Sequence, residues 1–191
     1  MSKADDVASF VGRKIYEIER DIDSSRPVLA RLRRCAGKDV SESQEVWDIV
    51  LENMPESMMG KGTDGFEPSE SEIAVHTTMT LYSIQQQGKS ESVNGKMPFA
   101  EAVGRIGRTS NAVVPGVKRR FDAVLSSSDI NELSNHLRGL VQLIRQSDKP
   151  LRIDYMLLSR DLYQFQFPDG RRRVLMRWGQ EFYALRNDLE E

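Results

Sequence analysis

The sequence predicts an all-α protein that folds as a compact multi-helix bundle. Apolar residues recur at steps of three and four along most of the chain, as a helix with one buried face requires. Several of these stripes follow helix-start signals, in which Ser, Asp or Pro stands just before or within the first turn. No two segments show the alternation of apolar and polar residues that would indicate paired strands, and no internal repeat is present.

Four helices are expected in the first half of the chain. They are, in order, residues 7–22, a helix from Pro27 to Gly37, a helix opened by Ser41 and ending at Leu51, and a helix from Ile73 to Gln87. Pro27 has the fixed φ that suits a first helical turn, and Gly37 suits the residue after a helix end. The runs Ser41–Gln44 and Ser69–Glu72 have the spacing of capping boxes, which predicts that each opens a helix.

Two segments, residues 55–68 and 88–97, have the composition of loops. Both are long for connections inside a compact domain, and we expect them to be flexible until a partner orders them. Within the first, Gly60-Lys61-Gly62-Thr63 vaguely resembles a phosphate-binding loop. It lacks the required spacing and a preceding strand, so we do not assign it that role.

A series of helices is expected in the second half. The segments are, in order, Pro98 to Arg108, residues 116–126, Asp129 to Gln146, a helix capped by Asp154 and ending near Phe165, and a final helix through Leu185. The segment 129–146 carries the strongest apolar stripe of the chain. Pro168-Asp169-Gly170 is expected to form the turn before the final helix.

Length and composition restrict the class of protein. The 191 residues fit one domain, or two small helical lobes over residues 1–95 and 96–191 that share a core. Hydrophobic residues make up 39% and charged residues 29% of the chain, as in globular proteins. No apolar run approaches the roughly 18 residues that a membrane span needs, and the N-terminus lacks the apolar core of a signal peptide. We therefore expect a cytoplasmic protein.

The charges are sorted along the chain, although the formal net charge is only −2. Residues 1–95 carry 11 Lys and Arg against 17 Asp and Glu, whereas residues 96–191 carry 16 against 12. A basic face on a nearly neutral body is the usual footprint of a phosphate-binding surface.

Helical-wheel positions place a set of cations outside the apolar arcs. The set is rich in Arg, which binds phosphate through a planar bidentate fork. We expect few acids one turn away within residues 105–120, whereas Arg177 has Glu181 four residues on and is expected to form an ion pair. Any one such charge is usually a solvated residue, so the prediction rests on the set. The candidate nucleic-acid-binding residues are Arg105, Arg108, Lys118, Arg119 and Arg120, followed by Arg33, Arg34, Arg138 and Arg145. The role of Arg171 to Arg173 stays open.

Catalytic and metal-binding constellations are missing from the sequence. His76 and His136 are the only histidines, and neither has the spacing of a metal ligand, so both are interpreted as structural. Cys35 adjoins two arginines that would lower the pKa of its thiol, but a small buried residue is the preferred interpretation. The lone cysteine also excludes an internal disulfide and a cysteine-based metal cage.

Other residue types that often carry function are given structural roles. Asp154 and Asp161 are interpreted as a helix cap and a surface residue, and Trp47 and Trp178 as core residues. We therefore expect a non-catalytic protein without a metal, a cofactor, a small-molecule substrate or a membrane contact.

An ordered series of short segments runs through residues 25–185. The segments are Arg33-Arg34, Ala74 to Gln87, Phe99-Ala100-Glu101-Ala102, Lys118-Arg119-Arg120-Phe121, Asn135 to Val141, Pro150 to Tyr155, Asp161-Leu162 and Val174 to Tyr183. No single one is diagnostic, but in this order they resemble the small subunit of the type I-E CRISPR effector complex, Cascade. Residues 55–68 and 88–97 depart from the pattern of that family.

The resemblance implies an all-helical, non-catalytic subunit, two copies of which line the inner face of the complex. It implies contacts with the crRNA-carrying backbone subunits, with the large subunit and with a second copy of the chain. The basic face would help to hold the target and displaced DNA strands of the R-loop in antiviral defence, with the crRNA as a further candidate ligand. Such phosphate contacts act without sequence preference and depend strongly on salt.

Two other functions stay open. The first is a helical protein–protein adaptor whose basic face meets an acidic partner without direct nucleic-acid contact. The second is a nuclease with an unrecognised site, which the missing metal-ligand spacings disfavour.

Overall fold

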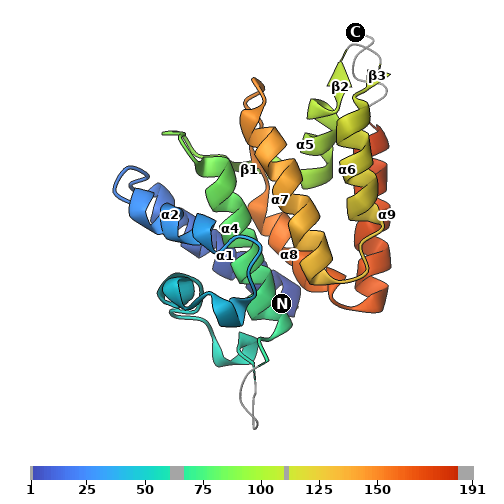
Figure 1. Ribbon diagram of the computed structural model, residues 1–191. Helices are drawn as coiled ribbons and strands as arrows, with labels where there is room; N and C mark the ends of the chain where they lie inside the picture. The colour runs from blue at the N-terminus through green and yellow to red at the C-terminus, as the bar shows by residue number, and fades with distance from the viewer. Residues whose placement is uncertain (1, 61–66, 110–111, 185–191) are drawn as a thin grey trace.

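The structure is a computed structural model that describes residues 2–60, 67–109 and 112–184 (Figure 1). The expected all-α class is confirmed, since the described residues are mostly helical. The α-helices, in chain order, are α1 (Lys3–Glu19), α2 (Arg26–Arg34), α3 (Trp47–Val50), α4 (Glu70–Gln86), α5 (Phe99–Ile106), α6 (Pro115–Leu125), α7 (Ile130–Gln146), α8 (Tyr155–Phe165) and α9 (Pro168–Ala184). Within the described ranges, no helix combines the length and the apolar character needed to cross a membrane.

The first helix begins earlier than its apolar stripe predicts, because a polar capping box opens it. The Ser2 hydroxyl accepts a hydrogen bond from the Asp5 N–H at 3.3 Å, and the Asp5 carboxylate accepts one from the Ser2 N–H at 3.1 Å. The apolar residues from Val7 to Ile18 are then buried on one face of α1, which packs against α8.

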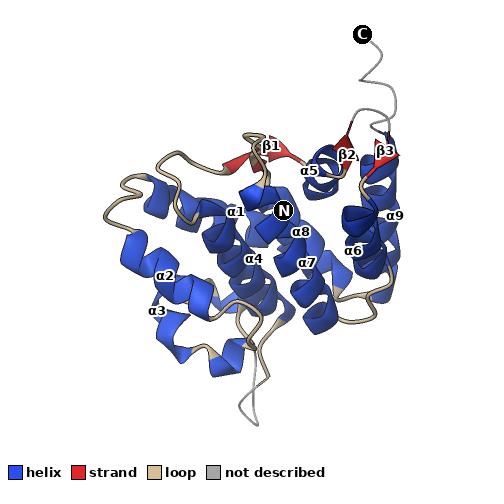
Figure 2. Ribbon diagram, turned by 45° about the horizontal axis from the view of Figure 1, so that its top comes forward, coloured by secondary structure: helices blue, strands red, loops and turns tan. Residues whose placement is uncertain are grey.

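α4 is the central helix of the bundle. Its residues from Ala74 to Gln86 are all buried, and α1, α2, α7 and α8 pack around it (Figure 2). Buried hydroxyls on α4 bond to carbonyl groups one turn back, as Thr78 does to Ala74 at 2.7 Å, which satisfies polar groups that would otherwise be costly to bury. The capping box predicted at Ser69 is confirmed at the start of this helix.

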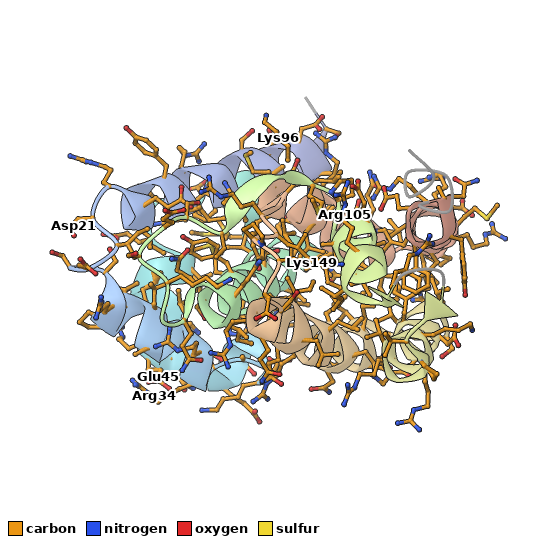
Figure 3. The ribbon with its side chains drawn as sticks, turned by 90° about the horizontal axis from the view of Figure 1, so that it is seen from above. Asp21, Arg34, Glu45, Lys96, Arg105 and Lys149 are labelled. Atoms are coloured by element: carbon orange, nitrogen blue, oxygen red, sulfur yellow. The ribbon has the colours of Figure 1, made fainter. Side chains whose placement is uncertain are left out.

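The remaining helices form two sides around α4 and α5. Figure 1 shows α2, α7 and α6 across the side that faces the viewer, and Figure 3, seen from above, shows the same three helices along one edge. α1, α8 and α9 form the opposite side, where α8 packs against both of its neighbours. The helices in front therefore belong to the segments that carry most of the predicted cations.

The apolar core runs through both halves of the sequence. Its buried residues extend from Val7 on α1 to Phe182 on α9. Buried polar contacts also join the halves, as where the Tyr155 hydroxyl donates to Oε1 of Gln85 at 2.6 Å. Because α8 packs on α1 and α4, residues 1–95 and 96–191 share one core.

Strands are present, although no strand pair is expected from the sequence. β2 (Arg108–Thr109) pairs antiparallel with β3 (Ala112–Val113), with Arg108 opposite Val113. β1 (Asn94–Met97) lies within the predicted 88–97 loop and makes parallel bridges to Ile153. These strands are too short to show a periodic pattern. Gly95 allows the close approach in β1, because a Cβ there would lie 2.6 Å from the Cβ of Arg152.

The helix predicted over residues 41–51 is wrong in its detail. The segment forms two 3₁₀ turns, η1 (Val40–Glu42) and η2 (Gln44–Val46), followed by the four-residue α3. Asp39 provides the cap, accepting from the Ser41 N–H at 2.8 Å, whereas Ser43 bonds to the Asp39 carbonyl. Trp47 is 40% exposed, and the prediction that it is a core residue is wrong.

Other predictions can be compared with the structure directly. Asp154 caps α8 and Trp178 is buried, as expected. The predicted surface position of Asp161 is wrong, since the residue as a whole is only 2% exposed. Pro168 to Gly170 form the first turn of α9 and not a separate turn. The 3₁₀ turn η3 (Glu56–Met58) occupies the start of the predicted 55–68 loop, while positions 61–66 and the predicted helix end at 185 lie outside the described residues.

Candidate nucleic-acid interface

Two of the predicted cations are paired with acids one turn away on their own helices. Nη2 of Arg105 lies 2.8 Å from the Glu101 carboxylate on α5. Nζ of Lys118 lies 2.7 Å from the Asp122 carboxylate on α6, and this contact raises the pKa of Lys118. The expectation of few acids near residues 105–120 is therefore wrong at both positions. Each pair leaves less free charge for a ligand, although both are partly solvated.

Arg108 has a structural contact. Its Nη2 donates to the carbonyl of Phe182 at 2.9 Å and to that of Tyr183 at 3.3 Å. These carbonyls lie in the last described turn of α9. The guanidinium thus joins β2 to α9.

Arg119 and Arg120 are exposed on α6. Among the described residues, neither has a carboxylate within 4.0 Å. Phe121 and its buried neighbours fix the rotation of α6, so that Arg119 points away from the core. Two arginines are thereby held on the outer face of α6 with their guanidinium groups available.

Arg138 projects from α7 toward the end of α2. Its Nη1 donates to the carbonyl of Ala36 at 3.1 Å, and the rest of the exposed guanidinium is not consumed by this bond. Gly37, whose φ is +85°, lets the chain leave α2 close to Arg138. The contact joins α2 and α7 into one surface.

Arg34 is exposed on α2 and paired. Its Nη2 lies 2.8 Å from the Glu45 carboxylate, which Lys38 also approaches at 3.9 Å. Figure 3 shows Arg34 beside Glu45, well apart from Arg105. The nine predicted residues therefore do not form one stripe: Arg105 lies away from the side made by α2, α7 and α6.

Arg33 on α2 and Arg145 on α7 are both half-buried. Arg33 donates from Nη1 to the Ser83 carbonyl at 3.2 Å. Burial lowers the pKa of Arg33, and the charges of Arg145 and Arg34 lower it further. Lys89 is not among the cations predicted from the sequence. Burial lowers its pKa, and the charge of Arg145 lowers it further. Its position after Gly88 in a predicted loop gave no helical-wheel signal.

A buried ionic network holds α8 and α9 together behind this side. The ion pair predicted between Arg177 and Glu181 is confirmed at 3.5 Å, and Arg177 also contacts Asp161. Burial raises the pKa of Glu181 to about 7, against the opposing effect of Arg177. Arg177 is half-exposed, and its contacts with Asp161 and Glu181 join α8 to α9.

The surroundings of His76 and Cys35 indicate structural roles for both residues. His76 is 2% exposed, and burial lowers the pKa of its imidazole to about 4. It lines a cavity of about 170 Å³ between α4 and α7. Cys35 is fully buried, and burial raises the pKa of its thiol, so the neighbouring arginines do not activate it. No group of three or more His, Cys, Asp or Glu residues suited to a metal occurs in the described part of the chain.

Comparison with known proteins adds a family and two solved structures. The family model described as CRISPR-associated protein Cse2 matches residues 28–183. The crystal structure of CasB from Thermobifida fusca aligns with a TM-score of 0.74 and 28% identity, over 94% of this chain and 98% of that one. M. ruber CasB aligns with a TM-score of 0.57 and 23% identity, over 82% and 83%, and supports the fold alone. No curated protein sequence matches the chain.

Proposed function

The chain belongs to the CRISPR-associated protein Cse2 family, the small subunit of the type I-E CRISPR effector complex, and we propose that it binds nucleic acid there without catalysing a reaction. The proposed ligands are the target and displaced DNA strands of the R-loop. The proposed surface is the side formed by α2, α7 and α6 (Figure 1). We further propose that the chain acts as a single helical domain.

One observation carries this proposal: arginines on that side have no carboxylate partner among the described residues. Arg119 and Arg120 are exposed on α6, and Arg138 bonds to a carbonyl group only. Arg33 and Arg145 lie at the α2–α7 junction without an acid within 4.0 Å. Planar guanidinium groups of this kind bind phosphates bidentately and independently of base sequence. Arg34, Arg105 and Lys118 are ranked lower because each is paired with an acid, and Arg108 because it bonds to α9.

A surface that binds phosphates can shift the equilibrium of R-loop formation. Replacing a DNA duplex by an RNA–DNA hybrid is nearly balanced in free energy, so a few phosphate contacts can favour the open state. An arginine stays charged at any physiological pH, which suits an electrostatic role and not proton transfer. The surface therefore supports binding as the function itself.

The chain also needs contacts with other subunits, for which we propose the crRNA-carrying backbone subunits, the large subunit and a second copy. Large apolar side chains are exposed on the opposite side, including Met176 on α9 at 64% and Tyr16 on α1 at 67%. These are candidate positions for protein contacts, because the cationic side is then left for nucleic acid.

The test replaces Arg119 and Arg120 with Gln and uses Arg105→Gln with Lys118→Gln as the matched control. Both double variants remove two positive charges, but only the first removes arginines without an acid partner. We expect the first to weaken target DNA binding by the assembled complex and to reduce the salt slope by about 0.7–0.9 per lost phosphate contact, with a smaller change in the control.

Equal binding by wild type and the Arg119/Arg120 variant across the salt series, with assembly intact, would reject the proposed surface. The adaptor function predicts a different result: the purified chain shows no salt-dependent DNA affinity, and the same variant is lost from the complex.

A further inference from the structure

Two cations from different elements line one cavity: Arg33 on α2 and Lys89 in the turn after α4. The charge of Arg145 on α7 acts on both, and the three residues are called the cluster below. Each is half-buried. Burial lowers the pKa of Arg33 and of Lys89, and the charge of Arg145 lowers both further, so all three share one electrostatic environment.

No acid neutralises this cluster within the described part of the chain. Asp23 is paired at 2.7 Å with Arg26, which lines the cavity described below, and Glu91 is paired with Arg152 at 3.0 Å. The Nε atom of Arg145 is buried and has no hydrogen-bond partner. Like charges held together out of water, with an unused donor, are unfavourable unless an anion joins them.

The fold holds Lys89 in place. Its N–H donates to the Gln86 carbonyl at 3.1 Å, and its own carbonyl accepts from the Gln86 side chain at 3.0 Å. Gln86 is only 1% exposed, and Gly88 has the φ of +77° that this turn requires. The lysine is therefore placed by the core and not by a free loop.

A cavity opens beside the cluster. Its volume is about 120 Å³, and Arg33, Lys89 and the segment 86–88 that ends α4 line it, with Leu29 at its apolar wall. Arg26 also lines the cavity, but it is paired with Asp23. A cavity of this size can hold one tetrahedral oxyanion, and its cations match the charge and hydrogen-bonding needs of a phosphate group.

We propose that Arg33, Lys89 and Arg145 form an oxyanion site that takes one phosphate group. We assign that phosphate to a nucleic-acid backbone, an assignment that rests on the function proposed above. The site would fix the position of one phosphate at the α2–α7 junction, while the exposed arginines of α7 and α6 contact the strand more loosely.

The first experiment titrates the purified full chain with inorganic phosphate and follows thermal unfolding. The proteins are wild type, Lys89→Gln, Arg145→Gln and the control Lys96→Gln. Lys96 is an exposed lysine on β1, which Figure 3 shows away from Arg34. We expect the Tm of wild type and control to rise with the logarithm of phosphate concentration, as ligand binding requires. Lys89→Gln and Arg145→Gln should lose this rise, and Lys89→Gln should unfold at an equal or higher temperature than wild type without phosphate, because one like charge is gone.

The second experiment measures the affinity of the same four proteins for a fluorescent single-stranded oligonucleotide over a salt series. We expect the slope of log K against log salt to fall by about 0.7 in each cluster variant and to stay unchanged in the control. An equal phosphate response in all four proteins would overturn the site. If the phosphate response is lost in the cluster variants but no protein binds the oligonucleotide, the oxyanion site stands with free phosphate as its ligand, and the proposed function fails.

Discussion

Trp178 donates its indole N–H to Oδ2 of Asp161 at 2.8 Å, and Arg177 contacts the other oxygen of the same carboxylate. The Asp161 side chain is 3% exposed. The ring of Trp178 packs against Phe99 with centroids 5.5 Å apart, so this ionic group lies where α5, α8 and α9 meet. A substitution there tests the fold behind the candidate interface without touching its cations.

Replacing Asp161 with Asn should destabilise the protein. The amide keeps the shape of the carboxylate but leaves Arg177 without its closest anion. Because the Arg177 side chain is 37% exposed, we expect a loss between the roughly 1 kcal/mol of a surface pair and the roughly 3 kcal/mol of a buried one. Chemical denaturation measures the loss. Asp169→Asn is the control, because Asp169 pairs with Arg172 at the surface and its loss should cost less than about 1 kcal/mol. Equal effects of the two substitutions would contradict the structural role.

Glu181 should make stability fall as pH rises toward neutrality. Its pKa is about 7 in the folded protein against 4.5 ordinarily, so the folded state holds a proton that the unfolded state has released. This contribution is fully present below pH 4.5 and is lost as pH rises through 7. Glu181→Gln should flatten the decline of the unfolding free energy between pH 5 and 8, measured by denaturant titration. The same decline in wild type and variant would show that Glu181 is not its source.

His76 should make stability fall as pH decreases below neutrality, which is opposite to the effect of Glu181. Its pKa is about 4 in the folded protein against 6.5 ordinarily. Between these pH values the unfolded chain binds a proton on this imidazole and the folded chain does not. Stability from this group is present above pH 6.5 and is lost as pH falls toward 4. His76→Gln should make the acid side of the stability profile less steep. His136→Gln, at the half-buried second histidine, should leave that steepness in place.

Replacing Arg108 with Gln should weaken the end of α9 and leave nucleic-acid binding unchanged. The substitution removes a charged donor from two terminal carbonyls, and we expect a loss of about 1–2 kcal/mol. Hydrogen exchange should speed up in the last turn of α9. A drop in the salt slope of DNA binding, with α9 unchanged, would instead place Arg108 on a phosphate.

Much of the fold could be predicted from local signals. The apolar stripe of α7 and the capping box at Ser69 involve residues within one or two turns, and the structure contains both. Trp47 and Asp161 were misplaced because their exposure depends on which distant helices cover them. Helix periodicity reports that one face is buried, but not which partner buries it.

The candidate site was harder to predict, because its contacts join distant residues. Arg108 donates to the carbonyl of Phe182, across most of the second half of the chain. Arg138 donates to the carbonyl of Ala36, which belongs to the first half. No wheel position of either arginine indicates such a carbonyl partner. The pair between Arg105 and Glu101 is local and could have been found from its spacing of four residues.

The packing of α1 against α8 has a consequence for how the protein is made. α1 leaves the ribosome well before α8, the helix that covers most of its apolar face. α4 is likewise enclosed only after α7 and α8 have been synthesised. Contacts so far apart in sequence slow folding and leave apolar surface exposed until most of the chain has emerged. A nascent chain that stalls before Tyr155 therefore presents an uncovered α1 to chaperones and proteases.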